Sequence, residues 1–139
     1  MKRVLFLCTG NSCRSQMAEG FLHHLGAEYF EAFSAGVMPI GVNSLAVEVM
    51  SEVGINIGSQ SSKSIKEFLS QKFDYVITLC ASAKGACPVF PGKCKRLHWN
   101  LDDPAQASGS DEKRIIVFRR IREQIKSHIE LFLNENRVC

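Results

Sequence analysis

The sequence of 139 residues lacks any hydrophobic run that approaches the ~18 residues of a membrane span, so we expect no membrane association. It also lacks a strong excess of charge. The 17 Lys and Arg against 14 Asp and Glu leave a net charge of +3, which suits small anions and argues against nucleic acid as a partner. No repeat, linker or low-complexity tract divides the chain. We therefore expect one domain over residues 1–139, large enough to fold without a structural metal.

Cysteine, in contrast, is plentiful, with six in the chain. The start Met1-Lys2-Arg3 followed by apolar residues imitates a signal peptide, but the apolar run stops at Cys8 and is shorter than a signal peptide needs. We therefore expect a cytoplasmic protein, whose thiols are kept reduced. Cysteines in such a compartment serve chemistry or metal binding more often than they form structural disulfides.

The pattern of apolar residues predicts alternating strands and helices. Apolar or β-branched runs predict strands over residues 4–8, 29–34, 74–79 and 96–99. Helical spacing predicts helices over 17–25, 46–53 and 110–132, and a capping-box pattern at Ser64 and Glu67 opens a further short helix. The alternation indicates an α/β domain with a parallel sheet, whose ligands bind at the carboxyl edge of the strands.

One segment at such an edge has the form C-x5-R, namely Cys8-Thr9-Gly10-Asn11-Ser12-Cys13-Arg14-Ser15. The spacing alone arises readily by chance, but here it lies between a buried strand and a helix start. Small polar residues at that position let backbone N–H groups surround an oxyanion, and Arg14 would add a planar pair of donors. The helix end and the guanidinium favour thiolate at Cys8, to which Ser15 is placed to donate. The alternative is a buried cysteine beside a solvated arginine.

Residues 4–19 (VLFLCTGNSCRSQMAE) resemble the anion loop of the low-molecular-weight protein tyrosine phosphatase superfamily, and most of all its thioredoxin-recycled arsenate reductases. The similarity covers nearly the whole chain, through Ser34-Ala35-Gly36, Thr78-Leu79-Cys80, Cys87-Pro88, His98-Trp99 and Asp102-Asp103-Pro104. It implies a four-stranded parallel sheet of order 2-1-3-4 flanked by helices. That order makes strands 1 and 3 neighbours, so Cys8 and Cys80 would lie close together.

The resemblance implies reduction of arsenate to arsenite. The implied roles are nucleophile for Cys8, oxyanion binding for Arg14 with the loop backbone, acid for Asp103, and second and third thiol for Cys80 and Cys87. Asp102 is the alternative acid. No organic cofactor is implied, and electrons would come from thioredoxin or from glutaredoxin and glutathione. We expect a monomer.

A phosphatase that hydrolyses phosphate monoesters through a phosphocysteine, with incidental second and third cysteines, is the alternative enzyme. The sequence departs from the phosphatase pattern at three positions: Ser12 replaces an aliphatic residue, Gln16 a proline and Ala105 an aromatic residue. These departures favour the reductase.

Two interpretations concern bound ions. Asn11, Glu19 and Ser34 match positions that help bind a monovalent cation in some relatives, where an acidic residue often completes the site. Here Lys63 stands in the corresponding stretch, and we hypothesise that its ammonium replaces the cation. An exposed lysine in a polar loop is the alternative.

The second interpretation is a non-enzymatic zinc site, for which four ligands are available: Cys80, Cys87, Cys94 and His98. Their cysteine spacings are wider than in zinc knuckles, and we expect no metal. Cys94 and Cys139 have no assigned role.

Overall fold

The computed structural model describes residues 1–85 and 87–136, so Cys139 lies outside the described residues. The elements follow in the order β1 (Lys2–Cys8), α1 (Arg14–Leu25), β2 (Phe30–Gly36), α2 (Ser44–Ser51), the 3-10 helix η1 (Ile65–Phe68), β3 (Tyr75–Thr78), α3 (Ala81–Gly85), β4 (Lys95–His98), the 3-10 helix η2 (Pro104–Gln106) and α4 (Asp111–Asn136). The strands run parallel in the order β2-β1-β3-β4, which confirms both the α/β class and the order implied by the resemblance.

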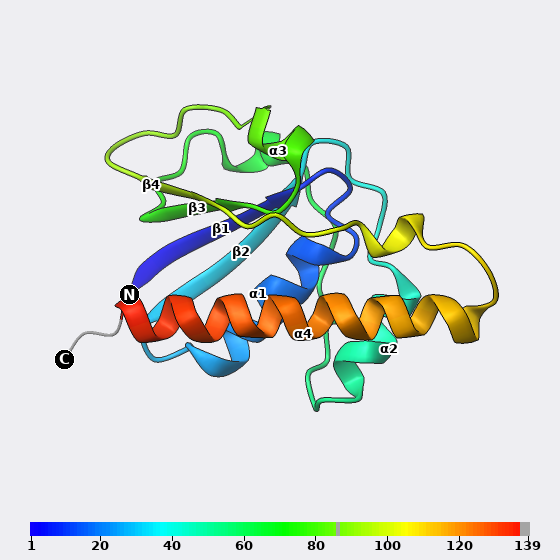
Figure 1. Ribbon diagram of the computed structural model, residues 1–139. Coiled ribbons are helices and arrows are strands. Elements are labelled where there is room, and N and C mark those ends of the chain that lie inside the picture. Colours follow the sequence, from blue (N-terminus) through cyan, green and yellow to red (C-terminus); the bar gives the residue numbers. More distant parts are fainter. Residues whose placement is uncertain (86, 137–139) are drawn as a thin grey trace.

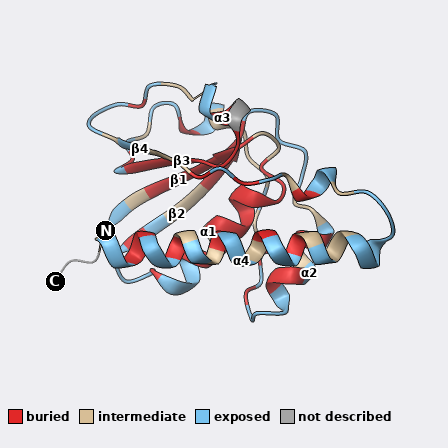
Figure 2. Cartoon of the chain, in the orientation of Figure 1, coloured by how far each residue is buried: buried red, intermediate tan, exposed pale blue. Residues whose placement is uncertain are grey.

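The sheet lies between two layers. Figure 1 shows α1, α2 and α4 together on one side and α3 on the other. The central strand β1 is at most 2% exposed from Val4 to Cys8, which explains why its apolar residues form a continuous run and do not alternate with polar ones. Figure 2 shows the same burial along β3 and in the first turns of α1, whereas β4 is half-buried or exposed. Within the part of the chain that the structure describes, no helix is both long and apolar enough to cross a membrane.

The helices confirm most of the predicted apolar positions, but Leu25 and Val53 are exposed, and not every boundary is as predicted. Along α4 the predicted apolar stripe is fully buried at Phe118, Ile121, Ile125 and Ile129. Ser64 forms the predicted capping box, although the element that it opens is a 3-10 helix. The helix α2 ends at Ser51, two residues before the predicted boundary. The short elements α3 and η2 were not predicted, because three to five residues are too few to show a period.

Candidate active site

The loop between β1 and α1 is shaped by Asn11. Its backbone has φ of 46°, in the left-handed region that asparagine tolerates better than most residues. Its side chain donates to Ser15 Oγ at 2.8 Å and accepts from the Lys63 N–H at 2.7 Å. Asn11 therefore holds the curl of the loop and ties it to the segment around Lys63.

The carbonyl groups of this loop are all engaged by neighbouring segments. The oxygens of residues 8–12 accept hydrogen bonds from the N–H groups of Val37, Met38, Ile40 and Asn43, the Gln16 amide and the Ser62 hydroxyl. In a trans peptide the N–H points opposite to the carbonyl, so the following N–H groups face the inside of the loop. That arrangement, at the N-terminus of α1, is a ready site for an oxyanion.

Gly36 lets the end of β2 approach the loop closely. A Cβ at this position would lie 2.7 Å from both Thr9 O and Asn11 N, which are backbone atoms that cannot move aside. The Gly36 N–H also donates to Lys63 O at 2.8 Å. Glycine is therefore required here for the loop to keep its shape.

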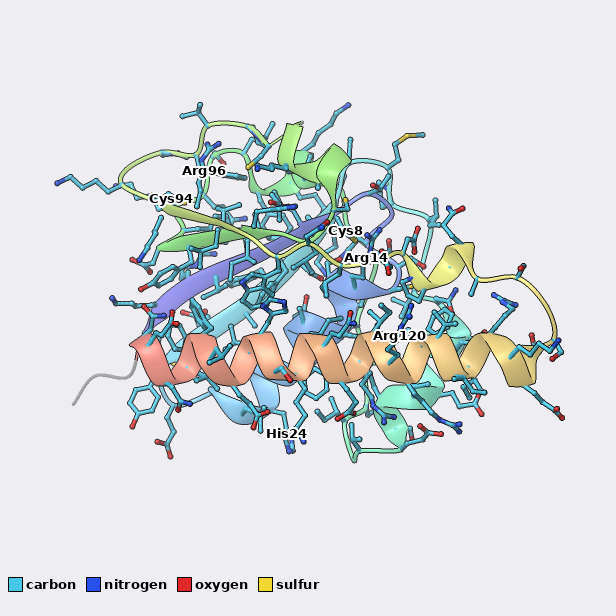
Figure 3. All side chains as sticks on the ribbon, in the orientation of Figure 1. Cys8, Arg14, His24, Cys94, Arg96 and Arg120 are labelled. Carbon is cyan, nitrogen blue, oxygen red and sulfur yellow. The ribbon has the colours of Figure 1, made fainter. Side chains whose placement is uncertain are left out.

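Cys8 lies at the bottom of a cavity of about 310 Å³ at the carboxyl end of β1. The cavity is lined by Cys8, Thr9, Gly10, Ser12, Cys13, Arg14, Met38, Ile40, Asp103, Ala105 and Gln106. The Cys8 sulfur is 2.8 Å from Ser15 Oγ, the partner that the sequence indicated. Figure 3 shows Cys8 and Arg14 side by side at this end of the sheet.

Arg14 is buried and oriented by carbonyl groups. Its Nη1 donates to Leu101 O at 3.1 Å and to Leu79 O at 3.4 Å. Its Nη2 lies 3.6 Å from Asp103 Oδ2 across the cavity. The neighbouring Asp102 is 84% exposed and pairs with Arg120 instead, so Asp103 is the carboxylate at the cavity.

Cys80 contacts the loop from the adjacent strand. It follows β3, which pairs with β1, and its sulfur is 3.3 Å from Thr9 Oγ1. The sulfur also accepts the Ala83 N–H at 3.4 Å, so the first turn of α3 covers it. The second thiol is thus buried directly beside the oxyanion loop.

Cys87 is not part of this cluster. It is half-buried in a separate pocket of about 390 Å³ that it shares with Lys84, Arg96 and His98. Burial raises the pKa of its thiol, and Arg96 opposes that shift. The five described cysteines are all thiols. The structure therefore groups Cys8, Arg14 and Asp103 around one cavity, places Cys80 against Thr9 of the same loop, and places the predicted third thiol in a different pocket.

The residues matched to a cation site lie beneath the loop. Ser34 Oγ donates to Glu19 Oε1 at 2.6 Å, and the Lys63 ammonium lies 3.9 Å from the same oxygen. Lys63 Nζ also donates to Ser61 O at 2.7 Å. Burial raises the pKa of Glu19, while the hydrogen bond from Ser34 and the charge of Lys63 lower it. The Lys63 side chain is only 22% exposed, unlike a lysine in a solvated loop.

The residues that brace the loop from below were not predicted. Gln16 donates to Asn11 O at 3.0 Å and to Ser61 O at 2.9 Å, and Gln60 donates to Gln16 Oε1 at 2.7 Å. Gln16 stood out only as a departure from proline. Two of its partners, Gln60 and Ser61, lie more than 40 residues further along the chain, where no sequence signal connects them to Gln16.

Within residues 1–85 and 87–136, no three His, Cys, Asp or Glu side chains form a group that could hold a metal ion. The four residues weighed as zinc ligands are therefore not brought together. His98 instead pairs with Thr78, its Nδ1 lying 2.7 Å from Thr78 Oγ1.

Comparison with known proteins gives consistent relatives. The sequence profile of the family "Low molecular weight phosphotyrosine protein phosphatase" matches residues 3–137. An arsenate reductase of Halalkalibacterium halodurans is 50% identical over 132 residues, which cover 94% of each chain. This chain is thus similar to that enzyme over nearly its full length.

Solved structures agree. An arsenate reductase in an oxidized state superposes with a TM-score of 0.84 at 36% identity, over 97% of this chain and 98% of the other. A thioredoxin-dependent arsenate reductase of Corynebacterium glutamicum gives 0.76 at 30% identity, over 97% of this chain and 61% of that one. A low molecular weight protein tyrosine phosphatase of T. tengcongensis gives a TM-score of 0.79 at 28% identity, over 97% of this chain and 99% of that one.

Proposed function

The chain belongs to the low molecular weight phosphotyrosine protein phosphatase family, and from that premise we propose that it reduces arsenate to arsenite by passing a disulfide through Cys8, Cys80 and Cys87. Within the family it is an arsenate reductase and not a phosphatase, since the relative with that name is 50% identical and the phosphatase structure 28%. The observation that carries the proposal is the contact between Cys80 Sγ and Thr9 Oγ1, which sets a second thiol against the oxyanion loop.

The first step is attack of the Cys8 thiolate on arsenic. The inward N–H groups and the Arg14 guanidinium bind the arsenate oxygens, and an As–S bond forms while one oxygen leaves as water. Asp103 faces the cavity and supplies the proton for that oxygen.

The second step is reduction. The Cys80 thiolate attacks the Cys8 sulfur, a Cys8–Cys80 disulfide forms, and the As–S bond breaks with its electron pair on arsenic. Arsenic(V) thereby becomes arsenic(III), and the two thiols supply both electrons. Phosphorus(V) is not reduced by thiols, so a phosphatase has no use for a second thiol in this place.

The third step frees Cys8. The Cys87 thiolate attacks the Cys80 sulfur, a Cys80–Cys87 disulfide forms, and Cys8 leaves as thiolate. Cys87 lies in its own pocket, so α3 must rearrange first. This five-residue helix contains small residues, and its contacts with Cys80 include two hydrogen bonds, from the Ala83 N–H to Sγ at 3.4 Å and from the Lys84 N–H to Cys80 O at 3.0 Å.

We expect the reaction to occur in the cytoplasm, on a monomer, with thioredoxin as electron donor. The thioredoxin-dependent structural relative supports that donor over glutaredoxin and glutathione. The test is arsenate-dependent NADPH oxidation, with each reductant system supplied separately. We expect turnover with thioredoxin and its reductase.

Cys80→Ser should abolish that turnover but keep slow hydrolysis of a small aryl phosphate, because the loop and Asp103 are untouched. Full turnover by Cys80→Ser would contradict the relay.

We further propose that the Lys63 ammonium does the work of a monovalent cation beneath the loop. Its contacts with Glu19 and Ser61 support this. A cation at this place balances the negative charge of the Glu19 carboxylate. It also holds in place the segment whose Lys63 N–H donates to Asn11.

A further inference from the structure

Cys94 is a second partly exposed thiol on the side of the molecule that holds Cys87. By contrast, Cys8 and Cys80 are 2% and 7% exposed. Figure 3 shows Cys94 and Arg96 together near β4, well away from Cys8 and Arg14. The three-thiol relay gives Cys94 no task.

Cys87 shares a pocket with Arg96, and Cys94 stands two residues before Arg96 in the chain. Successive residues of a strand alternate between faces, so Cys94 shares its face with Arg96. The hydrogen bonding of β4 to the neighbouring strand begins at Lys95, whose N–H donates to Asp74 O at 2.9 Å. Arg96 lines the pocket of about 390 Å³ in which Cys87 lies. The two thiols therefore flank one guanidinium.

Arg96 also ties the segment that follows Cys87 to β4. Its Nη2 donates to Pro88 O at 2.6 Å, which fixes the residue after Cys87 against β4. Burial raises the pKa of both thiols, and Arg96 lowers both. A charge on Cys87 also raises the pKa of Cys94. A thiolate that forms on either residue meets the same stabilising cation.

The chain between them can close on itself. Residues 88–93 form no helix or strand, and Gly92 has φ of 78°. Phe90 anchors the middle of this loop on Phe73, with ring centroids 5.5 Å apart. Since β4 begins at Lys95, joining Cys87 to Cys94 breaks no strand pairing. Closing so short a loop also costs little chain entropy.

We propose that Cys94 is a fourth thiol, which accepts the disulfide from Cys87 so that the oxidised protein waiting for its reductant holds a Cys87–Cys94 bond. The proposal rests on the relay above. The Cys94 thiolate attacks Cys87 in the Cys80–Cys87 disulfide, the Cys87–Cys94 bond forms, and Cys80 leaves with the electron pair and takes up a proton. No electrons enter or leave, because arsenate has already oxidised the pair. A dithiol protein then reduces the disulfide away from the anion cavity.

This fourth thiol changes the stoichiometry of the protein without reductant. Once the disulfide has moved to Cys87 and Cys94, both Cys8 and Cys80 are thiols again. They can then reduce a second arsenate and stop as a Cys8–Cys80 disulfide. Four thiols supply four electrons, enough for two arsenates, whereas three thiols can pass on only one pair.

The test is the amount of arsenite formed when prereduced, reductant-free protein is given excess arsenate anaerobically. We expect about two arsenites per chain for the unmodified protein and for Cys139→Ser, a control that removes a cysteine with no assigned role. Cys94→Ser should form about one. Peptide mapping should find Cys87 joined to Cys94 only where Cys94 is present. Equal yields from the unmodified protein and Cys94→Ser would overturn the proposal.

No arsenite from any of these proteins would instead contradict the proposed function. The pairing itself is then decided in Cys8→Ser/Cys80→Ser, oxidised with diamide and mapped in the same way. A Cys87–Cys94 crosslink supports the fourth thiol, and two alkylated cysteines at these positions overturn it.

Discussion

At the scale of single residues, the surroundings of each cysteine differ more than its position in the sequence suggests. Cys8 and Cys13 belong to the same loop and both line the cavity, but the Cys8 sulfur lies 2.8 Å from Ser15 Oγ, whereas the Cys13 sulfur contacts Ser12 Oγ at 3.9 Å. Burial raises the pKa of Cys13 to about 12, so that thiol stays protonated at neutral pH. Cys8, the proposed nucleophile, thus differs from Cys13 in its contacts and not in its residue type.

Asp103 and Asp102 give a matched pair of variants at this scale. Asp103→Asn removes the carboxyl group that faces Arg14 and should lower kcat for arsenate reduction roughly 10²- to 10⁴-fold, the usual contribution of a positioned acid. Asp102→Asn changes an exposed side chain and should leave kcat unchanged. Steady-state kinetics of both variants decides between them, and an equal loss in the two would refute the assignment of the acid.

Lys63 allows a second residue-level prediction. If its ammonium replaces a bound cation, activity should be the same in potassium and in a large organic cation at equal ionic strength. Lys63→Ser should lose activity in the organic cation and regain part of it in potassium, because the oxygens of Glu19 and Ser34 would then be available to the ion. Strong activation of the unmodified protein by potassium would count against the idea.

At the scale of elements, the path from β1 through the loop to α1 depends on the end of β2. Gly36→Ala places a Cβ 2.7 Å from backbone atoms of Thr9 and Asn11 and should reduce the free energy of unfolding by roughly 1–3 kcal/mol. It should also weaken phosphate binding, because the loop must move. Gly85→Ala is the control, since its Cβ meets nothing within 4 Å. Urea unfolding and phosphate titration measure both effects, and equal behaviour of the two variants would show that the close approach is unimportant.

Most elements could be predicted because their burial leaves a period or a run in the sequence. The fully buried β1 gives a continuous apolar run, and α4 gives a stripe with one buried face. The helix α3 gives neither, because five residues make little more than one turn. The separate pocket that holds Cys87 could not be predicted either. Residues of β4 line it, and they meet the segment around Cys87 only in the folded chain.

The site shows the same limit. The residues of the loop are contiguous, so their pattern, together with its place between a buried strand and a helix start, indicates an oxyanion site. The choice between Asp102 and Asp103 came from the resemblance, and the structure supports it through the direction of each side chain. The bracing by Gln16 and Gln60 depends on a contact between distant segments, which a single sequence does not reveal.

At the scale of the whole molecule, the buried Cys13 thiol links stability to pH. The unfolded chain loses this proton near pH ~8.5, whereas the folded protein keeps it until about pH 12. Between these values the unfolded state binds fewer protons, so the free energy of unfolding falls as pH rises, by at most about 1.4 kcal/mol per pH unit. Cys13→Ala should show a shallower fall than the unmodified protein in urea unfolding from pH 8 to 10.5. The same slope in both would mean that burial does not shift this thiol.

The central claim is that arsenate oxidises Cys8 and Cys80 before the disulfide reaches Cys87. The most direct measurement is peptide mapping of Cys87→Ala after one equivalent of arsenate, under anaerobic conditions and with alkylation of the remaining thiols. The account predicts a single turnover that stalls with Cys8 joined to Cys80, the thiol held beside the loop through Thr9. A crosslink between Cys8 and Cys13, or sustained turnover by this variant with thioredoxin, would contradict it.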